Sequence, residues 1–167
     1  MLANLCCAYA SVLAQSLSQE HYTNGALRAE GQEINQNRTG LWRLYYPDGA
    51  LAAEELYKAG QLHGPAHYYY PDSTIQTIET WEHGLQQDSA FYYHANGHLE
   101  KKGRYEKSVY EGEWVFYYPH GEIKRKGSYR AGYPQGLWSF YHANGILQQK
   151  GCFEKGKENG PWRYYRP

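Results

Sequence analysis

The most regular stretch of the sequence is residues 112–136, whose first part has a large aromatic side chain at every second position. Aromatic residues take every second position of its first part: Trp114, Phe116 and Tyr118. This alternation predicts a β-strand. Residues 119–121 read Pro-His-Gly and predict a turn, after which residues 123–129 can form a returning strand. The stretch therefore predicts a β-hairpin, followed by a turn at 131–134 that leads to the next hairpin.

The same pattern recurs along the chain at a spacing of 24 residues. The turn glycines that follow this spacing are Gly25, Gly49, Gly97, Gly121 and Gly145. Two further columns continue without a break. One holds Tyr45, Tyr69, Tyr93, Tyr117, Tyr141 and Tyr165, and the other holds Leu27, Leu51, Ile75, Leu99, Ile123 and Leu147. A fixed period of this length indicates a repeat architecture, so we expect an all-β array of about six antiparallel β-hairpins.

Each column has a physical reason. A turn glycine allows a positive φ without a steric penalty. The aliphatic and aromatic columns stack on their copies in neighbouring units, and this buries surface that one hairpin cannot bury alone. An isolated hairpin is only marginally stable in water, so the array is the stable unit.

The repeated pattern resembles the MORN repeat, in the bacterial variant found in proteins classed as YwqK-type antitoxins. The pattern G-x-W-x-x-Y-Y-x-x-G-x-L stands at residues 40–51, and a close copy stands at 136–147. The resemblance covers residues 17–167 and implies a single-layer array used for protein or lipid contact. Four positions depart from the pattern, and we expect the array to be bent or loosened near them: Ala66 and Ala90 replace tryptophan, Ser73 replaces the turn glycine, and Asp88 replaces the opening glycine.

The composition limits the kinds of partner that the protein can bind. The 17 basic and 17 acidic side chains give zero net charge, which argues against a nucleic-acid-binding stripe. Aromatic residues make up 17% of the chain, with nineteen tyrosines. This suits a sheet built from amphipathic rings better than an aliphatic core, and it opposes disorder.

Residues 1–16 differ from the rest, because they carry no charged side chain. They resemble a secretory signal peptide with cleavage before Gln15, although the basic start of such a peptide is missing. The alternative is a first helix that caps the sheet. We therefore expect a secreted or envelope location if the segment is a signal, and a cytoplasmic one otherwise. Residues 17–167 form the repeat domain.

The sequence offers little chemistry. His94 and His142 occupy equivalent positions two units apart, which is too far for one metal ion. Cys152 is the only cysteine after residue 16 and has no partner there for a disulfide. The chain contains no nucleophile elbow and no phosphate-binding glycine loop. We therefore predict no catalytic site, no metal and no cofactor, and thus a protein that is not an enzyme.

The aromatic columns are the remaining candidate for a binding surface. The rings selected are Trp42, Tyr45, Tyr69, Tyr93, Trp114, Tyr117, Trp138, Tyr141 and Trp162. Three hypotheses use them. The first is a protein-interaction scaffold. The second, which follows from the resemblance, is an antitoxin that binds one toxin. The third is a module that binds lipid head groups or sugars, with sugar rings stacked on Trp42, Trp114 or Trp138.

Overall fold

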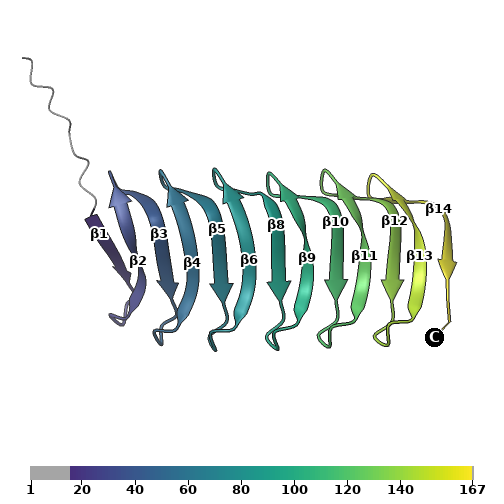
Figure 1. Ribbon diagram of the computed structural model, residues 1–167, viewed down its shortest axis with the longest axis horizontal. Helices are drawn as coiled ribbons and strands as arrows, with labels where there is room; N and C mark the ends of the chain where they lie inside the picture. The colour runs from purple at the N-terminus through teal and green to yellow at the C-terminus, as the bar shows by residue number, and fades with distance from the viewer. Residues whose placement is uncertain (1–15, 167) are drawn as a thin grey trace, which may run out of the picture.

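The computed structural model describes residues 16–166, which form strands and turns of one antiparallel sheet (Figure 1). The strands are β1 (Ser16–His21), β2 (Leu27–Ile34), β3 (Asn37–Tyr45), β4 (Leu51–Lys58), β5 (Gln61–Tyr69), β6 (Ile75–Glu82), β7 (Leu85–Gln86), β8 (Asp88–Tyr93), β9 (Leu99–Glu106), β10 (Val109–Tyr117), β11 (Ile123–Arg130), β12 (Tyr133–Tyr141), β13 (Leu147–Glu154) and β14 (Lys157–Tyr164).

Neighbours in the sequence are neighbours in the sheet. The strands pair in chain order from β1 to β14, and only the short β7 lies off this path, paired with β6. Figure 1 shows the strands side by side in a single layer. The predicted array of hairpins with a 24-residue period is therefore confirmed. Because each strand pairs only with its neighbours in the sheet, each unit is stabilised mainly by the units on either side.

One edge of the sheet is formed by turns that repeat the same hydrogen bonds. At Gly49 the amide donates to the carbonyl of Tyr46 at 2.9 Å, and the amide of Ala50 donates to the Asp48 side chain at 3.0 Å. The five predicted turn glycines have φ between 79° and 97°. Ser73 holds the same turn with φ 67°, so this unit keeps its turn without glycine.

The opposite edge is formed by two-residue turns. Both central residues have positive φ, as at Ala131 (50°) and Gly132 (81°). This is the geometry of the tight hairpin turn that matches the twist of the strands. The amide of Gly132 also donates to the carbonyl of Tyr110 at 3.0 Å, which ties each turn to the hairpin before it.

The expected disturbance is found at Asp88. In the other units a single strand runs through the opening glycine, which takes a positive φ, such as 66° at Gly40. Asp88 adopts a similar φ of 61°, but the strand is divided there into β7 and β8. The paired residues of β6 and β8 are Thr77 with Tyr92 and Ile78 with Phe91. The sheet is thus loosened locally while its strand order continues.

A row of tyrosine hydroxyls links successive units. The hydroxyl of Tyr46 donates to the carbonyl of Tyr69 at 2.7 Å. Tyr22, Tyr70 and Tyr118 make the same bond in their own units. His94 and His142 occupy this position in the other two units, and their buried Nε2 atoms have no hydrogen-bond partner among the described residues. The shorter imidazole does not reach the carbonyl that a tyrosine hydroxyl reaches.

We therefore expect His94→Tyr to raise the free energy of unfolding by about 1 kcal/mol, because the new hydroxyl can donate to the carbonyl of Tyr117. Urea unfolding followed by circular dichroism measures the change. Tyr118→Phe is the matched control and should lose a similar amount. A His94→Tyr variant that is less stable than the parent would contradict this interpretation of the row.

The predicted signal or cap at residues 1–16 falls almost wholly outside the described residues, and only Ser16 belongs to β1. Among residues 16–166 there is no helix of the length and apolarity needed to cross a membrane.

Candidate functional site

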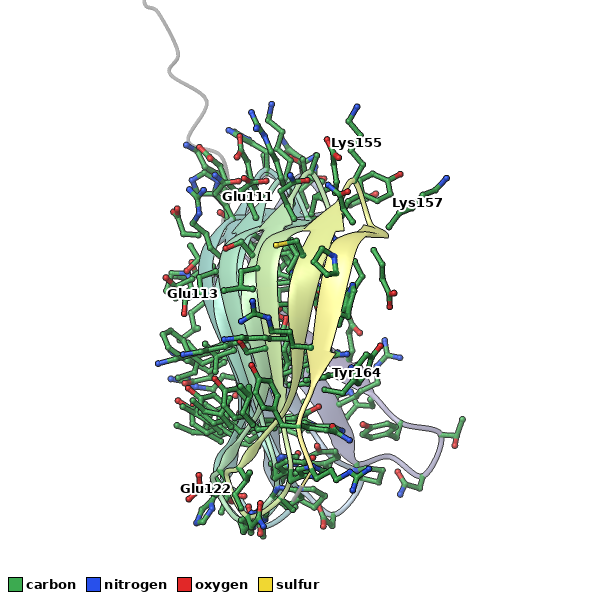
Figure 2. All side chains as sticks on the ribbon, turned by 90° about the vertical axis from the view of Figure 1, so that its right-hand side faces the viewer. Glu111, Glu113, Glu122, Lys155, Lys157 and Tyr164 are labelled. Carbon is green, nitrogen blue, oxygen red and sulfur yellow. The ribbon has the colours of Figure 1, made fainter. Side chains whose placement is uncertain are left out.

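The sheet has two faces of different character, and Figure 2 views it along the layer, with Glu113 and Tyr164 on opposite sides. Strand alternation places Trp42, Leu44 and their copies on one face, here called the tryptophan face. Arg43, Tyr45 and their copies lie on the other, here called the tyrosine face. The rings predicted as one binding surface are therefore divided between two faces.

The tryptophans form the core of the single layer. Trp42 and Trp114 are fully buried and Trp138 is 2% exposed. The ring of Trp114 stacks on Tyr110 at 3.9 Å between centroids and meets the edge of Tyr105 at 5.2 Å. The expectation that sugars stack on Trp42, Trp114 or Trp138 is therefore wrong, because neighbouring rings already cover them. Trp162 remains half-buried.

Trp42 and its copies at 24-residue spacing each lie over a glycine of the preceding strand. Glu30 pairs with Arg43 and Gln32 with Thr39, so Gly31 alone faces the bulge that ends at Trp42. A Cβ at Gly31 would come within 2.5 Å of the ring. The indole nitrogen of Trp42 donates to the carbonyl of Gln32 at 3.0 Å. The same overlap would occur in three further pairs: Gly103 with Trp114, Gly127 with Trp138, and Gly151 with Trp162.

In the two units without tryptophan, both the tryptophan and the glycine that it covers are replaced. Ala66 and Ala90 stand where tryptophan would be, and Glu55 and Glu79 stand where the glycine would be. Both glutamates are 7% exposed. A small residue thus faces a large one in every unit, with the order reversed in these two. Sequence reasoning missed this glycine column, although the same 24-residue spacing contained it.

Tyrosine hydroxyls satisfy the buried carboxylates. Tyr57 donates to Glu55 at 2.7 Å, and Tyr68 donates to its other oxygen at 3.0 Å. Glu79 accepts from the Tyr92 hydroxyl and from the side-chain amide of Gln86, both at 2.7 Å. Since buried charge is costly unless it is hydrogen-bonded, these contacts explain how the two units tolerate the exchange.

Burial of these hydroxyls predicts a loss of stability in alkali. Burial raises the pKa of Tyr57 to about 12, and it raises the pKa values of Tyr68, Tyr92 and Tyr105 above the ordinary 10.0. The unfolded chain therefore releases these protons at lower pH than the folded chain. Stability is full below pH 10 and falls as the pH rises from about 10 toward about 12.

Urea midpoints measured across this range, together with the absorbance of tyrosinate, test that prediction. Tyr92→Phe should make the decline less steep, because it removes one of the shifted groups. A midpoint that stays constant through the alkaline range would contradict it.

The tyrosine face carries a row of half-buried rings: Tyr45, Tyr69, Tyr93, Tyr117 and Tyr141. In the early units their hydroxyls meet carboxylates. Tyr45 donates to Glu30 at 2.8 Å and Tyr69 to Glu54 at 3.2 Å. The copies of these glutamates in the later units are lysines: Lys102, Lys126 and Lys150.

The charge of the chain is divided along the array. Residues 1–83 contain four Lys or Arg and nine Asp or Glu, whereas residues 84–167 contain thirteen and eight. The first half is therefore acidic and the second half basic by the same amount. The zero net charge of the whole chain does not show this difference, but a separate count of charged residues in each half of the sequence would have found it.

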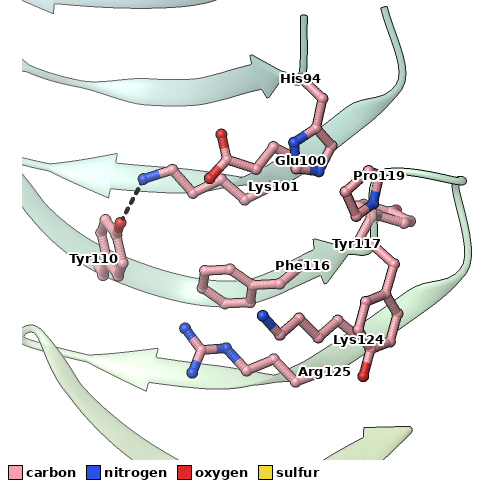
Figure 3. Close-up of a pocket in the computed structure, with 10 residues that line it drawn as sticks. His94, Glu100, Lys101, Tyr110, Phe116, Tyr117, Pro119, Lys124 and Arg125 are labelled. Carbon is pink, nitrogen blue, oxygen red and sulfur yellow. Dashed lines mark hydrogen bonds between the residues drawn. The ribbon is translucent and has the colours of Figure 1, made fainter. Parts of the chain in front are cut away.

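A pocket of about 480 Å³ lies on the tryptophan face between β9, β10 and β11, with several basic side chains in its lining (Figure 3). Lys101 and Arg125 come from β9 and β11, and Phe116 lies between them on β10. Figure 3 shows the Lys124 side chain extending alongside the Phe116 ring. Glu100 and His94 complete one side of the pocket.

Histidine does not gather into a metal centre in the described part of the chain. His63 and His83 are neighbours, with ring centroids 5.1 Å apart. Within residues 16–166, however, no group of three His, Cys, Asp or Glu side chains is placed to hold a metal ion. Cys152 is exposed.

Comparison with known protein families agrees with this architecture. Four segments match the family model described as the MORN repeat variant, at residues 38–59, 89–107, 110–131 and 134–155, and together they make up half of the chain. The chain belongs to the MORN repeat variant family. The gap between the first two MORN segments contains three of the four predicted departures: Ala66, Ser73 and Asp88. No curated protein gave a match to the chain.

MORN repeats are consistent with a binding module. The match identifies the repeat and does not extend to the antitoxin family, so that finer resemblance stays a prediction.

Proposed function

We propose that the protein is a non-catalytic scaffold that binds a protein partner along its tyrosine face. The observation that carries the proposal is the row of half-buried tyrosines on a face that no second layer covers in the described residues. Tyrosine combines a large apolar ring with a hydroxyl that tolerates water, and it is enriched at the energetic centres of protein interfaces.

Two further features of the same face support a protein partner. Leu41 is 42% exposed and Leu137 is 60% exposed, so large apolar side chains flank the tyrosine row. The row also runs from acidic positions near Glu30 and Glu54 to basic ones near Lys126 and Lys150. A partner of opposite polarity would bind this face in one orientation, because charge complementarity fixes register.

The lipid alternative has weaker support. The basic runs at 101–104 and 124–126 alternate between the two faces, so neither face collects all of their charge. Attraction to anionic lipid depends on a cluster of basic side chains at one surface.

Photo-crosslinking in native cells tests the proposal. A benzophenone side chain in place of Tyr141 or Leu137 should crosslink the same protein, and Lys126→Glu should weaken that product. The matched controls are a benzophenone at Lys155, in an edge turn, and Lys155→Glu. Crosslinking that is equal at Lys155, or absent at both face positions, would overturn the proposal. The identity of the captured protein also tests the antitoxin hypothesis.

We also propose that the protein is located outside the cytoplasm, and this location needs a separate measurement. Fractionation of native cells and the mass of the mature chain decide it. A product that begins at Gln15 in the envelope or medium supports an extracellular scaffold, and a cytoplasmic product that retains Met1 contradicts it.

A further inference from the structure

We propose that the pocket between β9, β10 and β11 on the tryptophan face binds the carboxylate of a glutamate or aspartate side chain in an acidic peptide. Its basic groups Lys101 and Arg125 lie on the opposite face from the tyrosine row, although Tyr117 of that row also lines the pocket. The site does not depend on the partner proposed above.

The basic groups of the pocket are positioned by rings. Lys101 Nζ lies 4.1 Å from the centroid of Tyr92 and donates to the Tyr110 hydroxyl at 3.1 Å. The guanidinium carbon of Arg125 lies 4.2 Å from the centroid of Phe116. Such contacts hold a cation in place but leave its charge uncompensated.

The pocket also contains a hydrogen-bond donor that has no acceptor among the described residues. Arg125 Nε is buried and has no hydrogen-bond partner among residues 16–166. In that same part of the chain, neither Lys101 nor Arg125 forms an ion pair, and Glu100 in the lining pairs with neither. Buried polar groups normally have partners, so an anion that accepts from Arg125 would complete the site.

The repeat itself shows which anion such a position takes. A pocket of about 400 Å³ lies at the equivalent place three units earlier, with Leu44 and Tyr46 where Phe116 and Tyr118 stand. There the Glu20 carboxylate bridges two arginines, Arg28 and Arg38, the latter at 2.6 Å.

The hydrogen bond from Arg28, and after it the one from Arg38, holds the pKa of Glu20 below its ordinary value. In the later pocket, Tyr92 replaces Glu20, and Glu100 and Tyr110 replace the two arginines, Arg28 and Arg38. Lys101 and Arg125 replace two alanines, Ala29 and Ala53. The cations of the later pocket therefore stand at other positions than the two arginines, and its own carboxylate, Glu100, forms no ion pair with them among residues 16–166. A carboxylate supplied by another chain would take the part that Glu20 plays in the first pocket.

Fluorescence anisotropy with a fluorescein-labelled hexaglutamate peptide tests the site on the intact protein. The wild-type protein should bind this probe and not a labelled hexaglutamine peptide. Arg125→Gln and Lys101→Gln should each weaken binding about tenfold, as expected for loss of one charge-assisted hydrogen bond. Lys155→Gln is the matched control, because it removes one positive charge from an edge turn that belongs to neither binding surface. It should change the affinity by less than about twofold.

Three outcomes would overturn the proposal. The first is absence of binding to hexaglutamate. The second is an equal loss in Arg125→Gln and Lys155→Gln, which would indicate nonspecific attraction to the basic half. The third is displacement of the probe by inorganic phosphate but not by glutarate, which would assign the pocket to a phosphate group. Thermal melting of each variant shows whether it is folded. Because the probe is defined, this result does not depend on whether a partner is captured on the tyrosine face.

Discussion

Trp114→Ala is expected to lower the free energy of unfolding by about 3–5 kcal/mol, the range for removing a large ring from a packed core. Trp114 is fully buried, and its ring contacts those of Tyr105, Tyr110 and Tyr129. Its indole nitrogen donates to the carbonyl of Arg104 at 3.1 Å, and that bond would also be lost. Because the sheet has a single layer, no second layer can move in to fill the cavity.

Urea unfolding followed by tryptophan fluorescence and circular dichroism measures this loss. Trp162→Ala is the matched control, since Trp162 is only half-buried and its indole nitrogen has no hydrogen-bond partner among residues 16–166. Its loss should be clearly smaller. Equal losses in the two variants would mean that burial in the middle of the array is not what stabilises this column.

Gly103→Ala is expected to cost about 1–3 kcal/mol, because the added methyl would overlap the ring of Trp114. The effect does not come from backbone strain, since Gly103 is not among the residues with positive φ. Alanine at such a position would otherwise be neutral or slightly stabilising. The expected cost therefore reports the close packing of ring and glycine.

A double-mutant cycle separates the two contributions. In a Trp114→Ala background, Gly103→Ala should cost little, because the ring that it would meet is gone. Gly151→Ala is a second control, since the half-buried Trp162 ring can move more easily. Equal costs of Gly103→Ala with and without the ring would show that the glycine has another role.

The hairpin array could be predicted because its causes are local and repeated. Alternating rings such as Trp114 and Phe116 define a strand, and the turn residues that follow define where it reverses. The 24-residue period then places each hairpin beside the next, since only neighbours can bury its rings. The departure at Asp88 was also visible, because a residue other than glycine stood in a glycine column.

The division of the rings between faces was only partly predictable. Alternation separates Trp42 from Tyr45, but it does not say which face is closed. The answer depends on the bulge opposite Gly31, which brings the indole across the glycine of the preceding strand. The exchange of tryptophan and glycine for alanine and glutamate follows from that contact. It could be explained only once the contact was seen.

The period, the hairpins and the turns of this protein could be predicted from the sequence, because these depend on residues close together in the chain. The tertiary structure decided which rings are core and which are surface. It also decided which cations have an acidic partner, as Arg38 does and Arg125 does not among the described residues. These properties depend on contacts between strands, and the register and bulges that set them are fixed only when the strands pair.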